Sequence, residues 1–254
     1  MEFFGFDLSA LLPFIAIGFV AQLIDGAIGM AFGVITNTLL VSVLGVAPAQ
    51  ASARVHLVEM FTTAASGISH IYHRNVDWKL FARLAGPGVI GAILGAYVLT
   101  NIDASVAKPF VMAYLSGIGF YLLYKAWGYT HTHRIPKIIE PLGLIGGFLD
   151  AAGGGGWGPV VTSNLLIQGT SPRMTVGTVN TAEFFLTTAA SAVFVTQLGW
   201  QTFSIATFGL LIGGFVAAPL AAMVTRHIRP QRLMLMVGIV LTSTSLFSLY
   251  KALA

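Results

Sequence analysis

Long hydrophobic runs, separated by short polar stretches, make up almost the whole chain. A run of about 20 apolar residues is long enough to cross a bilayer as an α-helix. The sixth and seventh runs are short for a crossing, so the first two runs of each half are predicted either to cross or to re-enter as a hairpin. The predicted helical runs cover residues 9–24, 29–45, 50–72, 80–100, 106–126, 139–149, 157–168, 173–197, 203–225 and 231–251.

The composition indicates that these runs lie in a membrane rather than in a soluble core. Hydrophobic residues make up 56% of the 254 residues, charged residues only 9%, and the mean hydropathy is +0.84. Soluble domains carry about 25% charged residues, so this chain cannot cover a water-facing surface. We therefore predict an all-α polytopic membrane protein with about eight to ten hydrophobic helical segments.

The net charge and the cysteine content exclude some kinds of ligand and partner. The net charge of +4 is assigned to basic loops on the cytoplasmic side rather than to a nucleic-acid partner. The chain has no cysteine, which excludes disulfides and thiolate metal sites. No cofactor and no resident metal are expected.

The second half of the chain repeats the first at a nearly constant spacing. The stretch "VAQLIDGAIGMAFGV" near residue 20 resembles "IGGFLDAAGGGGWGP" near residue 145, and Asp25 lies 125 residues before Asp150. Ordered matches of this kind indicate an internal duplication. We predict a first transmembrane repeat over residues 1–128 and a second over residues 129–254, which together form one integrated domain.

An odd number of crossings in each half, five or three, inverts the second repeat relative to the first. Loop charges agree, because 70–79 is basic and its mate 195–201 is uncharged, while 100–108 is balanced and its mate 225–232 is strongly basic. Basic loops stay in the cytoplasm. We therefore predict that both termini lie outside and that the cytoplasmic segments are 70–79, 125–137 and 225–232.

Two glycine-rich segments, which we call the elbows, interrupt the runs at equivalent places: residues 25–33, "DGAIGMAFG", and residues 150–158, "DAAGGGGWG". Consecutive glycines break a helix, and irregular backbone at membrane depth must lie within protein or line a cavity. We predict an anion cradle at the second elbow, built from N–H groups ahead of the next helix. The alternative is tight helix packing, as expected for the GxxxG pair Gly91 and Gly95. The predicted donors are Gly155, Gly156, Trp157 and Gly158.

Four acidic residues lie within or beside the hydrophobic runs. Each charge costs about 3 kcal/mol at the bilayer centre, so their presence points to a polar cavity that binds substrate and carries protons. The structural alternatives are that the aspartates cap the elbows by accepting N–H bonds, and that the glutamates hydrogen-bond one helix to another. The acids form two repeat-related pairs, Asp25 with Asp150 and Glu59 with Glu183.

Two polar residues accompany the glutamates. His56 precedes Glu59 by three residues, and Asn180 precedes Glu183 by three. Residues three apart are neighbours on the surface of a helix. We therefore expect both pairs to face the same cavity.

The second elbow, "GGFLDAAGGGGWGP", and the stretch "VNTAEFF" with its mate "VHLVEMF" resemble the sulfite exporter TauE/SafE family of membrane permeases. The resemblance covers nearly the whole chain. It implies a multi-pass permease of the bacterial inner membrane that moves sulfite, sulfonates or related sulfur-containing anions, driven by an ion gradient that we expect to be protons. The candidate substrate-binding residues are Gly153, Gly154, Gly155, Gly156, Asn180, Glu183, His56, Glu59, Asp25 and Asp150.

Other functions make different demands on the same residues. A cation or metal transporter would use the buried His, Glu and Asp side chains as ligands. An intramembrane enzyme would use Asp25 and Asp150 as a dyad, but the GxGD and GxSG patterns are absent from the sequence, so we expect no enzyme. A scaffold does not need buried acids. A homodimer could form through Gly91 and Gly95, although the same motif also packs helices within one chain.

Overall fold

The hydrophobic runs of the first half form helices in the computed structural model, which describes residues 2–3, 6–28, 31–127, 136–162, 164–165, 168–200, 205–227 and 230–253. Ahead of them, two short strands, β1 (Glu2–Phe3) and β2 (Phe6–Asp7), pair antiparallel. The helices begin and end within a few residues of the predicted runs, which confirms the helical class. They are α1 (Leu8–Ile28), α2 (Phe32–Ser42), α3 (Pro48–Tyr72), α4 (Trp78–Asn101) and α5 (Ala104–Trp127).

The second half is also helical, with one departure from the prediction. The run 157–168 does not form one α-helix, because residues 157–162 form a π-helix. The predicted linker 125–137 lies largely outside the described residues. The elements are α6 (Glu140–Gly153), the π-helix η1 (Trp157–Thr162), α8 (Pro172–Leu198), α9 (Ile205–His227) and α10 (Pro230–Leu253).

The π-helix follows directly after the glycines of the second elbow. A π-helix has a wider hydrogen-bonded turn than an α-helix and forms short segments. Pro159 within it has no N–H to donate. A hydrophobic run does not distinguish the two kinds of turn, so the run alone could not predict it.

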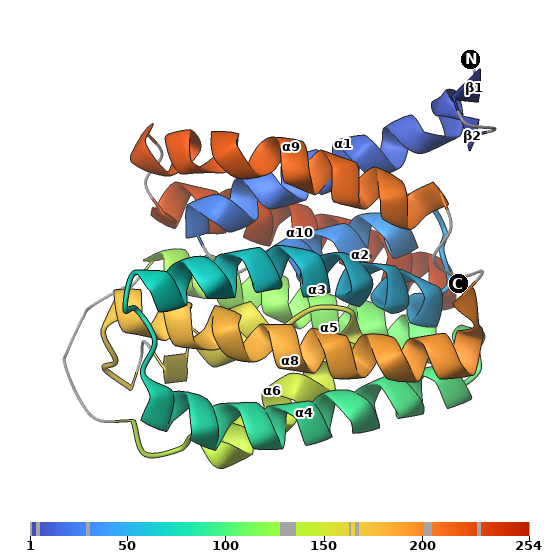
Figure 1. Ribbon diagram of the computed structural model, residues 1–254. Coiled ribbons are helices and arrows are strands. Elements are labelled where there is room, and N and C mark those ends of the chain that lie inside the picture. Colours follow the sequence, from blue (N-terminus) through green and yellow to red (C-terminus); the bar gives the residue numbers. More distant parts are fainter. Residues whose placement is uncertain are drawn as a thin grey trace.

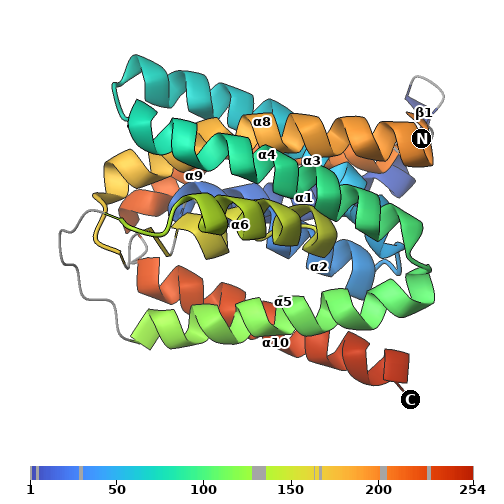
Figure 2. The same cartoon turned by 90° about the horizontal axis from the view of Figure 1, so that it is seen from below.

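Helices from the two halves pack against each other in reciprocal pairs. Helix α1 runs along α9 and α4 along α6, while α3 packs along α8 and α5 along α10 (Figure 1). Viewed from below, the short helices α2 and α6 lie between α3, α4 and α8 on one side and α5 and α10 on the other (Figure 2). Nine residues of α2 are buried, so it forms part of the interior.

The GxxxG pair of α4 is used within the chain. A Cβ atom built on Gly91 would lie 2.1 Å from the carbonyl oxygen of Leu144, and one on Gly95 would lie 2.3 Å from that of Phe148. Both partners belong to α6, and both glycines are buried. The pair therefore brings the backbones of α4 and α6 into contact, and it leaves no face for the homodimer considered above.

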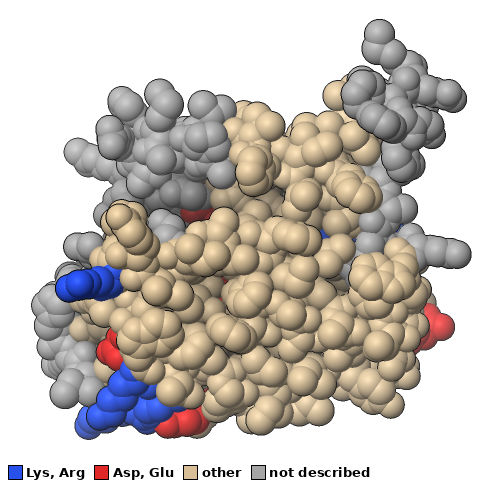
Figure 3. Space-filling model, viewed as in Figure 1, with Lys and Arg blue, Asp and Glu red and all other residues tan. Residues whose placement is uncertain are grey.

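One face of the molecule carries few charged side chains across the middle of its described part (Figure 3). Figure 3 shows one face on which the charged side chains gather toward the ends of the helices. Exposed Trp and Tyr side chains lie near the helix ends, among them Tyr72, Trp78 and Trp127 at one end and Trp200 and Tyr250 at the other. Aromatic residues concentrate in this way at membrane–water interfaces. In the described part of the chain, α4 and α5 are long and apolar enough to cross a bilayer on their own, and there are shorter apolar helices beside them.

Candidate functional site

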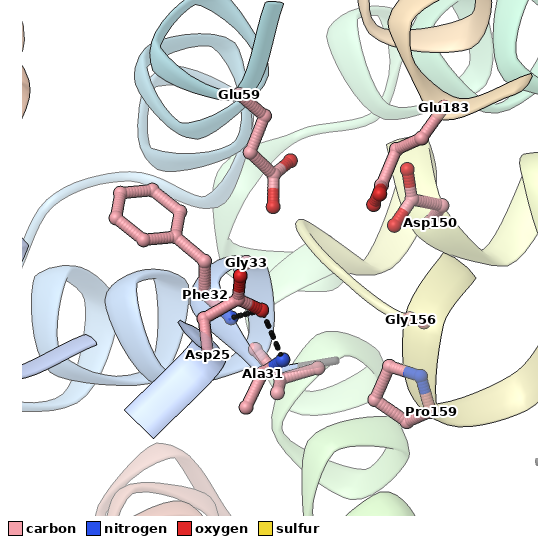
Figure 4. Close-up of a pocket in the computed structure, with 11 residues that line it drawn as sticks. Asp25, Ala31, Phe32, Gly33, Glu59, Asp150, Gly156, Pro159 and Glu183 are labelled. Carbon is pink, nitrogen blue, oxygen red and sulfur yellow. Dashed lines mark hydrogen bonds between the residues drawn. The ribbon is translucent and has the colours of Figure 1, made fainter. Parts of the chain in front are cut away.

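Four acids, two from each half of the chain, converge on one small cavity. Asp25 comes from α1, Glu59 from α3, Asp150 from α6 and Glu183 from α8, and all four line the cavity (Figure 4). Its volume is about 20 Å³, which is room for about one water molecule. The remaining lining residues come from the two elbows and the turns that follow them. They are Ala31, Phe32, Gly33, Val34, Gly156, Gly158 and Pro159.

The two aspartates cap the breaks between helices. Oδ1 of Asp25 accepts hydrogen bonds from the backbone N–H groups of Ala31 (2.7 Å) and Phe32 (3.1 Å). Oδ1 of Asp150 accepts one from Trp157, the repeat mate of Phe32, at 2.8 Å. Each carboxylate thus sits at the start of the helix that follows its elbow, where N–H groups lack helical partners and the helix dipole favours negative charge.

His56 holds the other oxygen of Asp150. Its Nδ1 lies 2.8 Å from the carbonyl oxygen of Ser52, and its Nε2 lies 3.1 Å from Oδ2 of Asp150. A carbonyl oxygen only accepts, so Nδ1 carries a hydrogen. The contact at Nε2 then needs one further proton, which belongs either to the imidazole or to the carboxyl. His56 and Asp150 are almost fully buried, and with that shared proton the pair has no net charge.

The two glutamates are bonded less fully than the aspartates, and Glu59 accepts a hydrogen bond from the backbone N–H of Gly33. Glu59 is only 5% exposed, and its Oε2 atom has no hydrogen-bond partner among the described residues. A Cβ on Gly33 would lie 2.8 Å from Oε1 of Glu59, so only a glycine allows this close approach of α2 to the carboxyl. Glu183 is half-buried and lines the opposite side of the cavity. Neither glutamate is paired with a basic side chain of the cavity lining or caps a helix with two amides, so these two are the candidate proton carriers of the cavity.

The glycines of the second elbow allow close contact with neighbouring helices. Helix α6 ends at Gly153, and Gly154 follows in the left-handed conformation with φ 72°. Side chains would collide with Tyr114 of α5 at Gly153, with Asn37 of α2 at Gly154, and with the backbone of Gly33 at Gly155. The two elbows therefore touch.

Of the predicted amide donors, two are occupied within the protein. The N–H of Gly155 donates to the carbonyl oxygen of Asp150 at 2.8 Å, and the N–H of Trp157 donates to its carboxylate. Gly156 and Gly158 line the cavity, whereas Gly153, Gly154 and Gly155 do not belong to its lining. The part of the second elbow that faces the cavity is thus shorter than the predicted cradle.

Asn180 is not brought to the cavity. Its Nδ2 donates to Oγ of Ser66 on α3 at 3.0 Å, so it joins α8 to α3. His56, its repeat mate, lies behind Asp150 rather than in the cavity lining. His56 and Glu59 were predicted to face the same cavity, and so were Asn180 and Glu183. In each of these two pairs only the glutamate lines the cavity.

Three side chains support the site in contacts that were not predicted, although the backbone N–H of one of these residues, Trp157, was among the predicted donors. The Tyr114 hydroxyl donates to the carbonyl oxygen of Gly155 at 3.3 Å, and Nδ2 of Asn37 donates to that of Gly153 at 2.8 Å. The buried Trp157 ring donates from Nε1 to the carbonyl oxygen of Val179 on α8. Three helices, α2, α5 and α8, are thus tied to one elbow. No sequence pattern marks Tyr114, whereas Asn37 follows the first elbow as Asn164 follows the second.

Comparison with known proteins assigns the chain to a family. A family model described as Sulfite exporter TauE/SafE matches residues 14–248. The chain belongs to this family. It is also 47% identical over 237 residues to the "Probable membrane transporter protein YtnM" of Bacillus subtilis (strain 168), a match that covers 90% of this chain and 79% of that protein. No solved structure matches. This TauE/SafE member is a membrane transporter.

Proposed function

We propose that this transporter is a secondary permease that moves sulfite, a sulfonate or a related sulfur-containing anion through the acid-lined cavity, together with protons. The family description supports the substrate class. The observation that carries the mechanism is the convergence of Glu59 and Glu183, one from each half of the chain, on a cavity that glycine backbone also lines. Paired broken helices in two halves are a recurring construction for such binding sites.

Protonation lets an acidic cavity accept an anion. An ionised carboxylate only accepts hydrogen bonds and repels an oxyanion, whereas a protonated carboxyl has an O–H that donates to it. A protonated carboxyl in an apolar site is an established donor to developing negative charge. Glu59 and Glu183 therefore bind the anion only in the protonated form. The anion and the protons therefore bind to the cavity together, which couples anion transport to proton transport.

Binding also requires the cavity to widen. A volume of about 20 Å³ holds about one water molecule, and a sulfite ion has four heavy atoms. The contact between the elbows, at Gly33 and Gly155, closes the site on one side. We propose that the elbows separate when the anion enters, and that the cavity opens alternately to the two sides of the membrane.

The alternation follows from two halves of inverted topology. The packing supports this: a Cβ on Gly18 of α1 would meet the carbonyl oxygen of Leu210 on α9, and a Cβ on Gly143 of α6 would meet that of Leu84 on α4. Gly18 and Gly143 are repeat mates 125 residues apart, and Leu84 and Leu210 are mates 126 apart. The contact of α1 with α9 therefore corresponds to the contact of α6 with α4. We propose a multi-pass protein of the bacterial inner membrane.

The second candidate function, transport of a cation or metal ion, is favoured by the four carboxyl groups. Among the described residues, however, no group of three or more His, Asp or Glu side chains is placed to hold a metal ion. One of the four acids is already paired with His56, and another is capped by two backbone amides. This occupancy supports the anion carrier.

The test is transport by the purified protein in liposomes. Radiolabelled sulfite is offered outside under an imposed pH gradient, acidic outside, and uptake is compared with protein-free vesicles. We expect saturable, gradient-dependent uptake of sulfite that unlabelled sulfonates or sulfate reduce by competition. No uptake of sulfite, sulfate or taurine, together with uptake of Na⁺ or Zn²⁺ by the same vesicles, would overturn the anion assignment.

A further inference from the structure

Two of the four acids at the cavity are already neutralised or stabilised by the protein. Asp150 shares a proton with His56, and Asp25 accepts two backbone N–H bonds at the start of α2. Both aspartates are therefore committed to structural contacts, Asp150 through both oxygens and Asp25 through Oδ1. The elbow that carries Asp150 is further fixed by the Tyr114 hydroxyl of α5.

Glu59 and Glu183 remain without a positive partner. No Lys, Arg or His lines the cavity in the described part of the chain. The titratable groups that face the glutamates are Asp25 from α1 and Asp150 from α6, with His56 of α3 behind the latter. A second observation points to binding at this place. Glu59 lines the cavity, and its buried Oε2 atom has no hydrogen-bond partner in the part of the chain that the structure describes.

A buried, unpaired carboxylate is so costly that it is neutralised by a proton rather than left charged. Glu59 is such a group, and half-buried Glu183 lines the same cavity without a basic partner among the lining residues. The two glutamates come from equivalent positions of the two halves of the chain, 124 residues apart, and together they take up two protons rather than one. We infer that Glu59 and Glu183 form a two-proton site, and that two protons cross the membrane with each divalent anion.

This inference rests on the proposed proton-coupled anion transport and adds its stoichiometry. The empty cavity, open to water, holds both glutamates ionised. The loaded cavity holds both protonated, each with its O–H toward an anion oxygen, and the two added positive charges offset the two charges of the anion. Loaded and empty forms carry the same net charge. Transport of a dianion is therefore electroneutral and does not respond to the membrane potential.

The test measures proton and sulfite uptake in the same proteoliposomes, with an internal pH indicator and radiolabelled sulfite, in buffer alkaline enough for sulfite to be a dianion. Potassium gradients with valinomycin set the membrane potential independently. The wild type is expected to take up two protons per sulfite and to show the same uptake at each potential. A ratio of one, or uptake that rises with an inside-positive potential, overturns the inference.

Variants of the two mates extend the test. Glu59→Gln removes one of the two proton-binding groups, so one proton is expected to enter with each sulfite. The anion then carries one net negative charge into the vesicle. One charge is worth about 2.3 kcal/mol per 100 mV. An inside-positive potential of about 100 mV therefore raises the equilibrium accumulation of sulfite about 50-fold in the variant. Glu183→Gln is expected to behave in the same way, and Glu140→Gln, outside the cavity, is expected to keep the ratio of two.

The outcomes separate the two proposals. A wild type that moves no sulfur anion refutes the proposed function, and this inference with it. A wild type that moves sulfite with one proton, or with a potential-dependent rate, refutes the stoichiometry alone. If a Gln variant does not fold, the wild-type ratio and the other variant still decide the question.

Discussion

Replacement of Asp150 tests the hydrogen-bond network that shapes the second elbow. Asp150→Ala leaves two buried groups without partners, the N–H of Trp157 and Nε2 of His56. Each buried orphan costs about 1–3 kcal/mol, so the alanine variant is expected to lose about 2–6 kcal/mol of stability. Asp150→Asn keeps both bonds, because its amide oxygen accepts from Trp157 and its amide nitrogen donates to a neutral His56. Its expected loss is about 1 kcal/mol, since charge-assisted bonds are stronger than neutral ones.

The assay is equilibrium unfolding of the purified variants in mixed detergent micelles, with increasing mole fraction of a denaturing detergent. The difference between Asn and Ala is the informative quantity, because both variants lose the same negative charge. A cost that is equal for the two variants would show that the charge of Asp150, and not its two hydrogen bonds, stabilises the elbow, and it would refute the network described here.

Three further predictions concern packing and topology. Gly91→Ala is expected to unfold at clearly lower denaturant, because its Cβ would lie 2.1 Å from a carbonyl oxygen of α6, whereas Gly86→Ala, with nothing within 4 Å, is expected to be as stable as the wild type. Trp157→Phe loses the buried indole hydrogen bond to α8 and is expected to be about 1–3 kcal/mol less stable in the same assay; full stability would contradict that role. Because the chain has no cysteine, a single introduced cysteine shows on which side of the membrane its loop lies. An impermeant maleimide added to intact cells is expected to label Asp103→Cys and not Arg74→Cys, and the reverse pattern would invert the predicted orientation.

The positions of the helices could be predicted from the sequence because a hydrophobic run of fixed length leaves few alternatives. The predicted run 80–100, for example, becomes Trp78–Asn101. The π-helix at 157–162 was not predicted, because a hydrophobic run indicates a helix but not the width of its hydrogen-bonded turns.

Side-chain directions at the cavity could be predicted only in part. Glu59 and Glu183 line it, but Asn180 binds Ser66 instead. Three residues turn a helix by about 300°, so neighbours on one face still differ in direction by about 60°, enough to separate a cavity from a helix contact. The contacts of Tyr114 with the elbow glycines depend on how α5 packs, which no local pattern in a single sequence encodes.

The most direct test of the acid-lined cavity is pH-gradient-driven sulfite uptake by Glu183→Gln, measured beside Glu140→Gln in the same liposome preparation. Glu183 lines the cavity, whereas Glu140 is an exposed acid that pairs with Arg83 at the start of α6. We expect the Glu183 variant to lose most of the stimulation of uptake by the gradient, and the Glu140 variant to keep it. Equal stimulation in both variants would contradict the assignment of proton coupling to this cavity.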